Sequence, residues 1–164
     1  MEVIRRILEV VGTKPVPSYS TGPMLIPGTV AAAAAAGDAL GTQWRVRCPK
    51  NSILQSAAYY DLSFLKAQVN VVVSREPFTI QIADNAAFDL PAGDELKVLY
   101  ELQFVAFSTH VTSAISFIDQ IGRVLRFPRG ECYLQAWMPA AFTPVAAKLP
   151  FISLDFLPDE EIFP

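Results

Sequence analysis

The sequence predicts an all-β chain: an antiparallel β-sandwich or a jelly-roll-like barrel with an extended N-terminal arm. From residue 42 onward, apolar and polar side chains alternate in short runs, which is the period of a half-buried strand. The 13 prolines and 8 glycines of the 164 residues separate these runs frequently. Strands do not alternate with helical segments, so a parallel nucleotide-binding sheet is not expected.

Residues 1–36 predict an arm rather than part of the core. Residues 1–11 place apolar side chains at helical spacing, but many of them are β-branched, which leaves a strand open as an alternative. Residues 12–29 are rich in proline and predict an extended segment. Because such arms often lie on a neighbouring subunit, we expect partner contacts from three apolar residues of this segment: Met24, Leu25 and Ile26.

An uninterrupted run of alanines, residues 31–36, ends at Gly37-Asp38. Alanine is the best helix former, but a helix this short is marginal in water, and strands follow directly. We expect Thr29 to Ala36 to be extended and packed against a surface that admits only small side chains, with a short helix as the alternative. Gly37-Asp38 should form a turn, and the first core strand should begin near Thr42.

The core of the predicted sandwich comes from short strands with clear alternation, roughly eight or nine in all. The longer ones are residues 42–48, 53–62, 68–74, 98–107, 131–138 and 149–157. Shorter candidates are residues 78–82, 111–118 and 121–127. Within residues 53–62, the alternation predicts that one face carries Leu54, Ala58, Tyr60 and Leu62. These strands define a domain over residues 37–157, followed by a tail over residues 158–164.

Composition limits the kinds of partner. Hydrophobic residues make up 52% and charged residues only 18% of the chain, which predicts surface that is buried against partners. A net charge of −3 argues against nucleic acid as a partner. Prolines interrupt the uncharged stretch over residues 15–37, and charges interrupt residues 1–11, so neither a membrane partner nor a signal peptide is expected.

No arrangement of residues predicts a reaction, a cofactor or a metal. Cys48 and Cys132 are expected to be free and buried, with a disulfide as the alternative, and two cysteines with one histidine are too few for a zinc site. The acidic loop over residues 84–95 could hold Ca²⁺, but Asp and Asn at strand ends usually cap turns. His110 has no nucleophile motif beside it. We therefore expect that the chain is not an enzyme.

Arginines and the C-terminal tail are the remaining candidates for partner contacts. Arg45 and Arg47 share the polar face of one predicted strand, and further arginines follow in residues 122–130: Arg123, Arg126 and Arg129. They form either a solvated face or contacts to acidic patches on a partner. The tail places Ile162 and Phe163 after three acidic residues, as expected for an arm that docks on a neighbour or for a frayed end.

Several short motifs occur in order along the chain. They are GDALG at residues 37–41, ILQSAAYYD at 53–61, DNAAFDLPAGD at 84–94 and FTPVAAKLPFISLDFL at 142–157. Over residues 37–157, this series resembles a group of small tailed-bacteriophage virion structural proteins from head-gene clusters. The resemblance implies a β-sandwich decoration or cement protein on the capsid surface of the virion, with the major capsid protein as its partner and no catalysis. A homotrimer is the preferred state, because closed symmetry suits a lattice.

Two other functions remain open from the sequence. A carbohydrate- or receptor-binding β-module of a tail or fibre would use exposed aromatic side chains, for which the candidates are Trp44, Trp137, Tyr59 and Tyr133. A minor head-tail connector component would have the same fold. Copy number in the virion separates a decoration protein from a fibre or connector protein, and glycan binding by the isolated chain would favour the carbohydrate-binding module.

Overall fold

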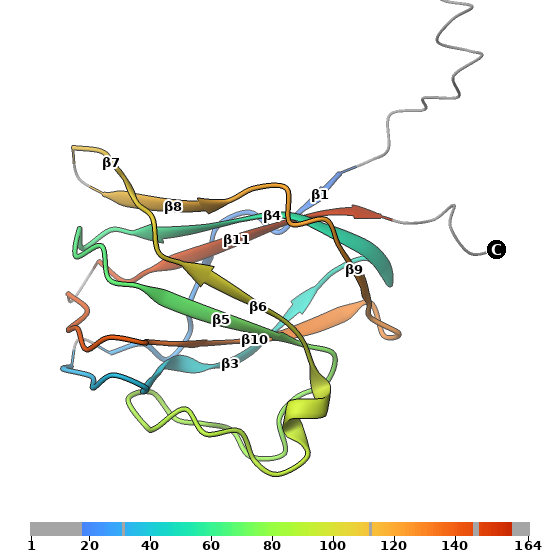
Figure 1. The fold of residues 1–164 in the computed structure, drawn as a ribbon, viewed down its shortest axis with the longest axis horizontal. Coiled ribbons are helices and arrows are strands. Elements are labelled where there is room, and N and C mark those ends of the chain that lie inside the picture. Colours follow the sequence, from blue (N-terminus) through green and yellow to red (C-terminus); the bar gives the residue numbers. More distant parts are fainter. Residues whose placement is uncertain (1–17, 31, 112, 146–147, 159–164) are drawn as a thin grey trace, which may run out of the picture.

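Two antiparallel sheets face each other in the computed structural model, which describes residues 18–30, 32–111, 113–145 and 148–158. One sheet has the order β1 (Tyr19–Ser20), β11 (Phe151–Pro158), β4 (Asn51–Asp61), β8 (Ala114–Ile118) and β7 (Ser108–Thr109). In the same sheet, β2 (Met24–Leu25) pairs with β11 and β9 (Arg123–Arg126) pairs with β4. The second sheet has the order β3 (Ala39–Arg47), β10 (Glu131–Trp137), β5 (Val69–Ser74) and β6 (Val98–Phe104). The two sheets stay separate (Figure 1), which confirms the predicted β-sandwich and not the barrel.

The core fills the space between the sheets with side chains from both. Among its largest fully buried members are Phe104, Phe127, Leu134, Leu154 and Phe156. Burial of each such side chain contributes about 1.5–3 kcal/mol. Cys48 and Cys132 belong to the same cluster and are both free, as the sequence predicts.

Residues 53–62 form a strand as predicted, but its core-facing residues differ from the prediction. Ser56 pairs with Asp155 and Leu54 pairs with Phe156, so Gln55 is an extra residue in β4. Such a bulge shifts the alternation of faces by one position. Beyond it, Ala57 and Tyr59 join Leu54 in the core cluster, whereas Tyr60 and Leu62 are half-buried and Ala58 is buried but outside this cluster.

Residues 78–82 are not a strand, which corrects a second prediction. Two of their backbone donors bond side chains rather than a neighbouring strand: Phe78 N–H donates to Gln43 Oε1 at 2.9 Å, and Thr79 N–H donates to Asp94 Oδ2 at 2.6 Å. Phe78 and Ile82 instead pack with Val72 in a second apolar cluster. The segment between β5 and β6, which includes the 3₁₀ helix η1 (Asp94–Lys97), therefore covers the outer face of the second sheet.

The described part of the alanine run is not helical, in agreement with the extended prediction. Ala34 forms a bridge to Phe142 and is buried, but Ala32, Ala33, Ala35 and Ala36 are exposed. Among the described alanines of this run, a requirement for a small side chain therefore applies at Ala34. The predicted turn is present, with Asp38 N–H donating to Ala35 O, and β3 begins at Ala39 because Ala39 and Leu40 already belong to the buried face.

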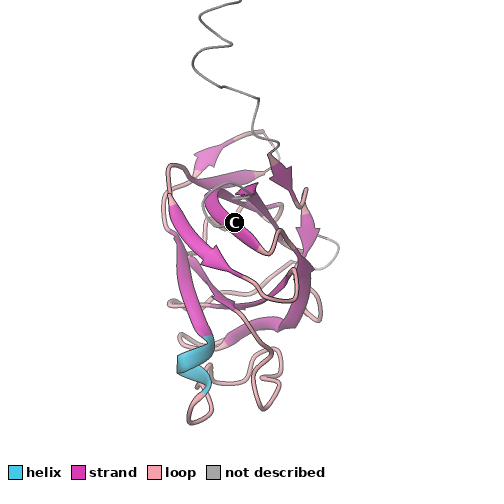
Figure 2. Cartoon of the chain, turned by 90° about the vertical axis from the view of Figure 1, so that its right-hand side faces the viewer, coloured by secondary structure: helices cyan, strands magenta, loops and turns pink. Residues whose placement is uncertain are grey.

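Residues 19–26, which the sequence assigns to the arm, lie along β11 and the residue before it. Tyr19 pairs with Phe156, and Met24 pairs with Ile152. Ile26 is fully buried in the core. β1 begins and β11 ends at the end of the sandwich that faces the viewer in Figure 2. Residues 1–17 and 159–164 lie outside the described residues.

Candidate interaction surface

Two chain crossings between the sheets lie side by side at one end of the sandwich. The first connects β3 to β4 through residues 48–50, and the second connects β9 to β10 through residues 127–130. Cys48 N–H donates to Gly130 O at 3.0 Å, and Phe127 N–H donates to Lys50 O at 2.6 Å. Because these backbone bonds fix the crossings to each other, the side chains beside them share one surface.

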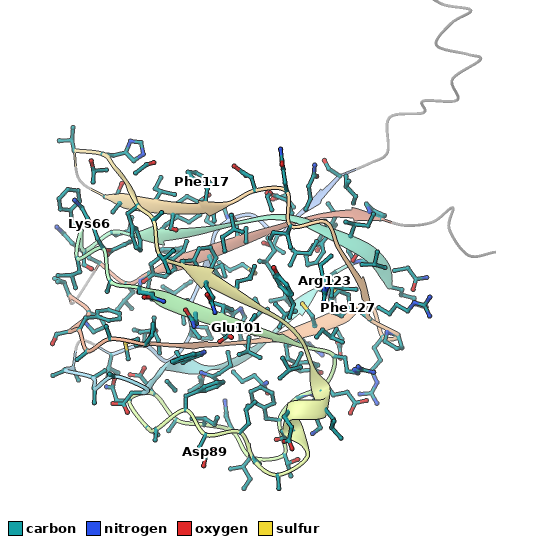
Figure 3. The ribbon with its side chains drawn as sticks, viewed as in Figure 1. Lys66, Asp89, Glu101, Phe117, Arg123 and Phe127 are labelled. Atoms are coloured by element: carbon teal, nitrogen blue, oxygen red, sulfur yellow. The ribbon has the colours of Figure 1, made fainter. Side chains whose placement is uncertain are left out.

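All six arginines of the described ranges are exposed and gather at this end, which we name the arginine end: Arg45, Arg47, Arg75, Arg123, Arg126 and Arg129. The strand register places them there. Arg47 pairs with Glu131 at the start of β10, Arg126 pairs with Asn51 at the start of β4, and Arg75 follows the last residue of β5. Figure 3 shows Arg123 toward this end and Lys66 toward the opposite one. Like charges gathered in this way repel one another and attract a negatively charged partner.

A shallow cleft of about 570 Å³ opens within the arginine end. Its charged lining comes from Arg75, Arg123 and Arg126, and its apolar lining comes from Leu99, Val124 and Leu125. The guanidinium of Arg123 lies 5.7 Å from the ring centroid of Tyr100, which holds that side chain over an aromatic face. The guanidinium group is suited to carboxylates, because it presents paired N–H donors in one plane.

Glu131 is an acidic neighbour of the cluster and already has partners within the chain. Its Oε2 lies 3.5 Å from Arg45 Nη1, and its Oε1 accepts a hydrogen bond of 2.8 Å from the Tyr133 hydroxyl. That hydrogen bond, together with burial and the charge of Glu131, raises the pKa of Tyr133, whereas Arg45 and Arg129 lower it by less. Tyr133 therefore keeps its proton and remains a donor to Glu131 at neutral pH.

The predicted contact residues fall into separate groups. The structure brings together the five predicted arginines and adds Arg75, which the sequence does not single out because the long segment after β5 hides its position. Leu25 is exposed and Met24 is half-buried, but Ile26 is a core residue and no longer qualifies as a surface contact. Ile162 and Phe163 lie outside the described residues.

Two acidic residues of the loop over residues 84–95, Asp84 and Asp94, accept hydrogen bonds from backbone N–H groups of other segments. Asp84 accepts hydrogen bonds from the N–H groups of Val30 and Gly41, which ties the loop to the segment before β3. Asp94 accepts from Thr79 N–H and Thr79 Oγ1 and lies 2.6 Å from Lys97 Nζ. In the part of the chain that the structure describes, His, Cys, Asp and Glu form no group of three that could hold a metal ion.

The aromatic residues proposed for carbohydrate binding do not form an exposed platform. Tyr59 is buried, and Trp44 packs against the core. Trp137 stacks on Phe88 with ring centroids 5.7 Å apart and donates its indole N–H to Glu101. The Tyr133 hydroxyl donates to Glu131 Oε1 at 2.8 Å. Over the same described residues, no helix has the length and apolarity needed to span a membrane.

No protein-family model matches the chain, and no curated protein is significantly similar to it. Among solved structures, it is similar to a chain of tomato aspermy virus determined by X-ray crystallography, at 12% identity with 100% of each chain covered and a TM-score of 0.39. A TM-score of this size carries no weight for function, which has to rest on the residues of this chain.

Proposed function

We propose that the chain is a virion structural protein that binds the capsid lattice as a decoration or cement protein through its arginine end. The single observation that carries the docking role is the exposure of all six described arginines at one end of the sandwich. Its partner is the acidic outer surface of a major capsid protein. The choice of that partner rests on the motifs that resemble small tailed-phage virion proteins, and the proposed role is binding rather than catalysis.

Binding of this kind stabilises a capsid by mass action. A protein that binds the assembled lattice and not the unfolded subunits shifts the equilibrium toward the assembled state. The sandwich contributes a rigid frame, because the two crossings beside which the arginines lie are hydrogen-bonded to each other. We extend the proposal to a homotrimer at three-fold positions, since closed symmetry matches the symmetry of a lattice.

A co-sedimentation experiment with purified capsids tests this proposal. Arg47→Glu combined with Arg129→Glu reverses two exposed charges beside the crossings, and we expect at least a tenfold loss of capsid affinity. Charge reversal converts attraction to acidic groups into repulsion, and wild-type binding should also weaken as salt is raised.

The matched control reverses the same amount of charge at the opposite end. Lys66→Glu combined with Lys148→Glu acts in the loops between β4 and β5 and between β10 and β11. This variant should bind capsids like the wild type. Equal loss of binding in both variants, or binding that is unaffected by Arg47→Glu and Arg129→Glu, would contradict the proposed contact surface.

A further inference from the structure

The cleft in the arginine end has a specific chemistry that lattice binding does not explain. Three arginines line it together with Leu99, Val124 and Leu125, so it offers cationic and apolar surface side by side. A ligand that matches both would carry carboxylates next to apolar side chains.

The end of β11 lies close to this cleft. Pro158, its last residue, pairs with Ser52 of β4, and Ser52 pairs on its other side with Leu125, a residue of the cleft lining. Neighbouring strands are about 4.8 Å apart, so Pro158 and Leu125 are separated by about 10 Å. The six residues that follow Pro158 can span up to about 20 Å when extended, which is enough to reach the cleft.

The sequence beyond Pro158 has the matching chemistry. It reads DEEIFP, with three carboxylates at residues 159–161 followed by Ile162 and Phe163. Attachment to β11 gives such a short segment an effective concentration in the millimolar range at the cleft, so weak attraction suffices for occupancy.

We propose that the C-terminal segment of the chain, residues 159–164, binds in the cleft of the same molecule. Its carboxylates pair with Arg75 and Arg123, and its apolar pair contacts Leu99 and Val124. An acidic partner surface then competes with this segment for the same arginines. Because the segment and the cleft belong to the same chain, their binding can be tested without a capsid, and a failure of capsid binding would leave it unaffected.

A peptide-binding experiment on full-length chains tests the inference. The probe is a fluorescein-labelled peptide of sequence DEEIFP, and the readout is fluorescence anisotropy at low salt. Neutralising the tail with Asp159→Asn, Glu160→Gln and Glu161→Gln should vacate the cleft without altering the sandwich. We expect this variant to bind the peptide at least tenfold more tightly than the wild type does.

Substitutions in the cleft, added to the neutralised tail, test whether the peptide binds there. Arg123→Glu or Arg75→Glu, added to the neutralised tail, should each reduce peptide binding at least tenfold, whereas Lys148→Glu should leave it unchanged. The peptide NQQIFP should bind poorly to every variant. Unchanged circular dichroism separates these effects from loss of the fold.

Three results would overturn the inference. The first is equal peptide affinity of the wild type and the neutralised tail, including no binding by either. The second is peptide binding that survives both arginine substitutions. The third is a difference between wild type and variant that grows as the chain concentration is raised a hundredfold, because that dependence would place the tail on a neighbouring molecule.

Discussion

Single carboxylates fix the loops of this molecule. Asp61 is buried and accepts hydrogen bonds from Ser63 N–H, Ser63 Oγ and Lys66 N–H. These bonds hold Phe64 and Lys66 at positive φ values of 63° and 53°, which side-chain-bearing residues rarely adopt. The partners of Asp61 are close in sequence, but Asp84 accepts from Val30 N–H and Gly41 N–H, 54 and 43 residues away, and the sequence does not show such distant partners. The sequence therefore does not reveal which of these carboxylates are buried or which groups donate hydrogen bonds to them.

The carboxylate of Asp94 makes the stability of the fold depend on pH. Burial raises its pKa, but hydrogen bonds from Lys97 and Thr79 and the charge of Lys97 outweigh burial, so its pKa lies below the usual value. A lowered pKa in the folded state stabilises the fold above the unfolded pKa of about 4, and this contribution is lost as the pH falls through the folded value. Asp94→Asn should therefore destabilise the chain at pH 7, and its deficit should shrink as the pH falls toward 3.

Urea unfolding of both proteins across that pH range measures this effect. Asp89→Asn is the control, because Asp89 is exposed and its change should stay within about 0.5 kcal/mol. A deficit of Asp94→Asn that is the same at pH 7 and pH 3 would show that the charge of Asp94 does not contribute.

At the scale of elements, alternation of apolar and polar residues predicts most of the fold. Strands appear at every long run that the sequence marks, because a sheet with one buried face imposes this period. The predicted alternation of faces is wrong where a contact outside the sheet replaces a hydrogen bond between neighbouring strands. In β4, the extra residue Gln55 lies where the neighbouring strand changes from β8 to β9, and its carbonyl accepts from Ile121 N–H instead. No local pattern in the sequence marks such a position.

Gly41 allows the close approach of two segments, which is a second feature of element geometry. Its φ is +70°, and a Cβ there would meet Pro27 O, with Ile26 Cγ2 at 2.8 Å and Thr29 Oγ1 at 3.0 Å. We expect Gly41→Ala to lower the free energy of unfolding by about 2–4 kcal/mol, because it adds this clash to a strained backbone.

Gly37→Ala is the matched control, measured with Gly41→Ala in urea. Gly37 has a φ of +89°, but a Cβ there would meet nothing within 4 Å. Its substitution should lower the free energy of unfolding by only about 1–2 kcal/mol, the backbone penalty alone. Equal losses in the two variants would mean that the segment over residues 26–29 moves away without a penalty.

At the scale of the whole molecule, the two ends of the sandwich differ in chemistry. The arginine end carries every described arginine, whereas the opposite end has the exposed apolar residues Phe64, Leu65 and Val111, with Lys66 and Lys148 nearby. The sequence identifies five of these arginines as candidates for partner contacts, but it does not show that they lie together at one end of the sandwich. Their common location depends on which strand ends lie next to one another. Arg75 lies near the other arginines because β5 pairs with β10.

Cryo-electron microscopy of purified virions would show directly whether the arginine end contacts a capsid lattice. We expect density for this chain at many symmetry-related sites on the capsid exterior, with the crossings over residues 48–50 and 127–130 against acidic side chains of the capsid protein. A bare capsid, density confined to the tail, or a bound chain whose arginine end faces solvent would contradict the account.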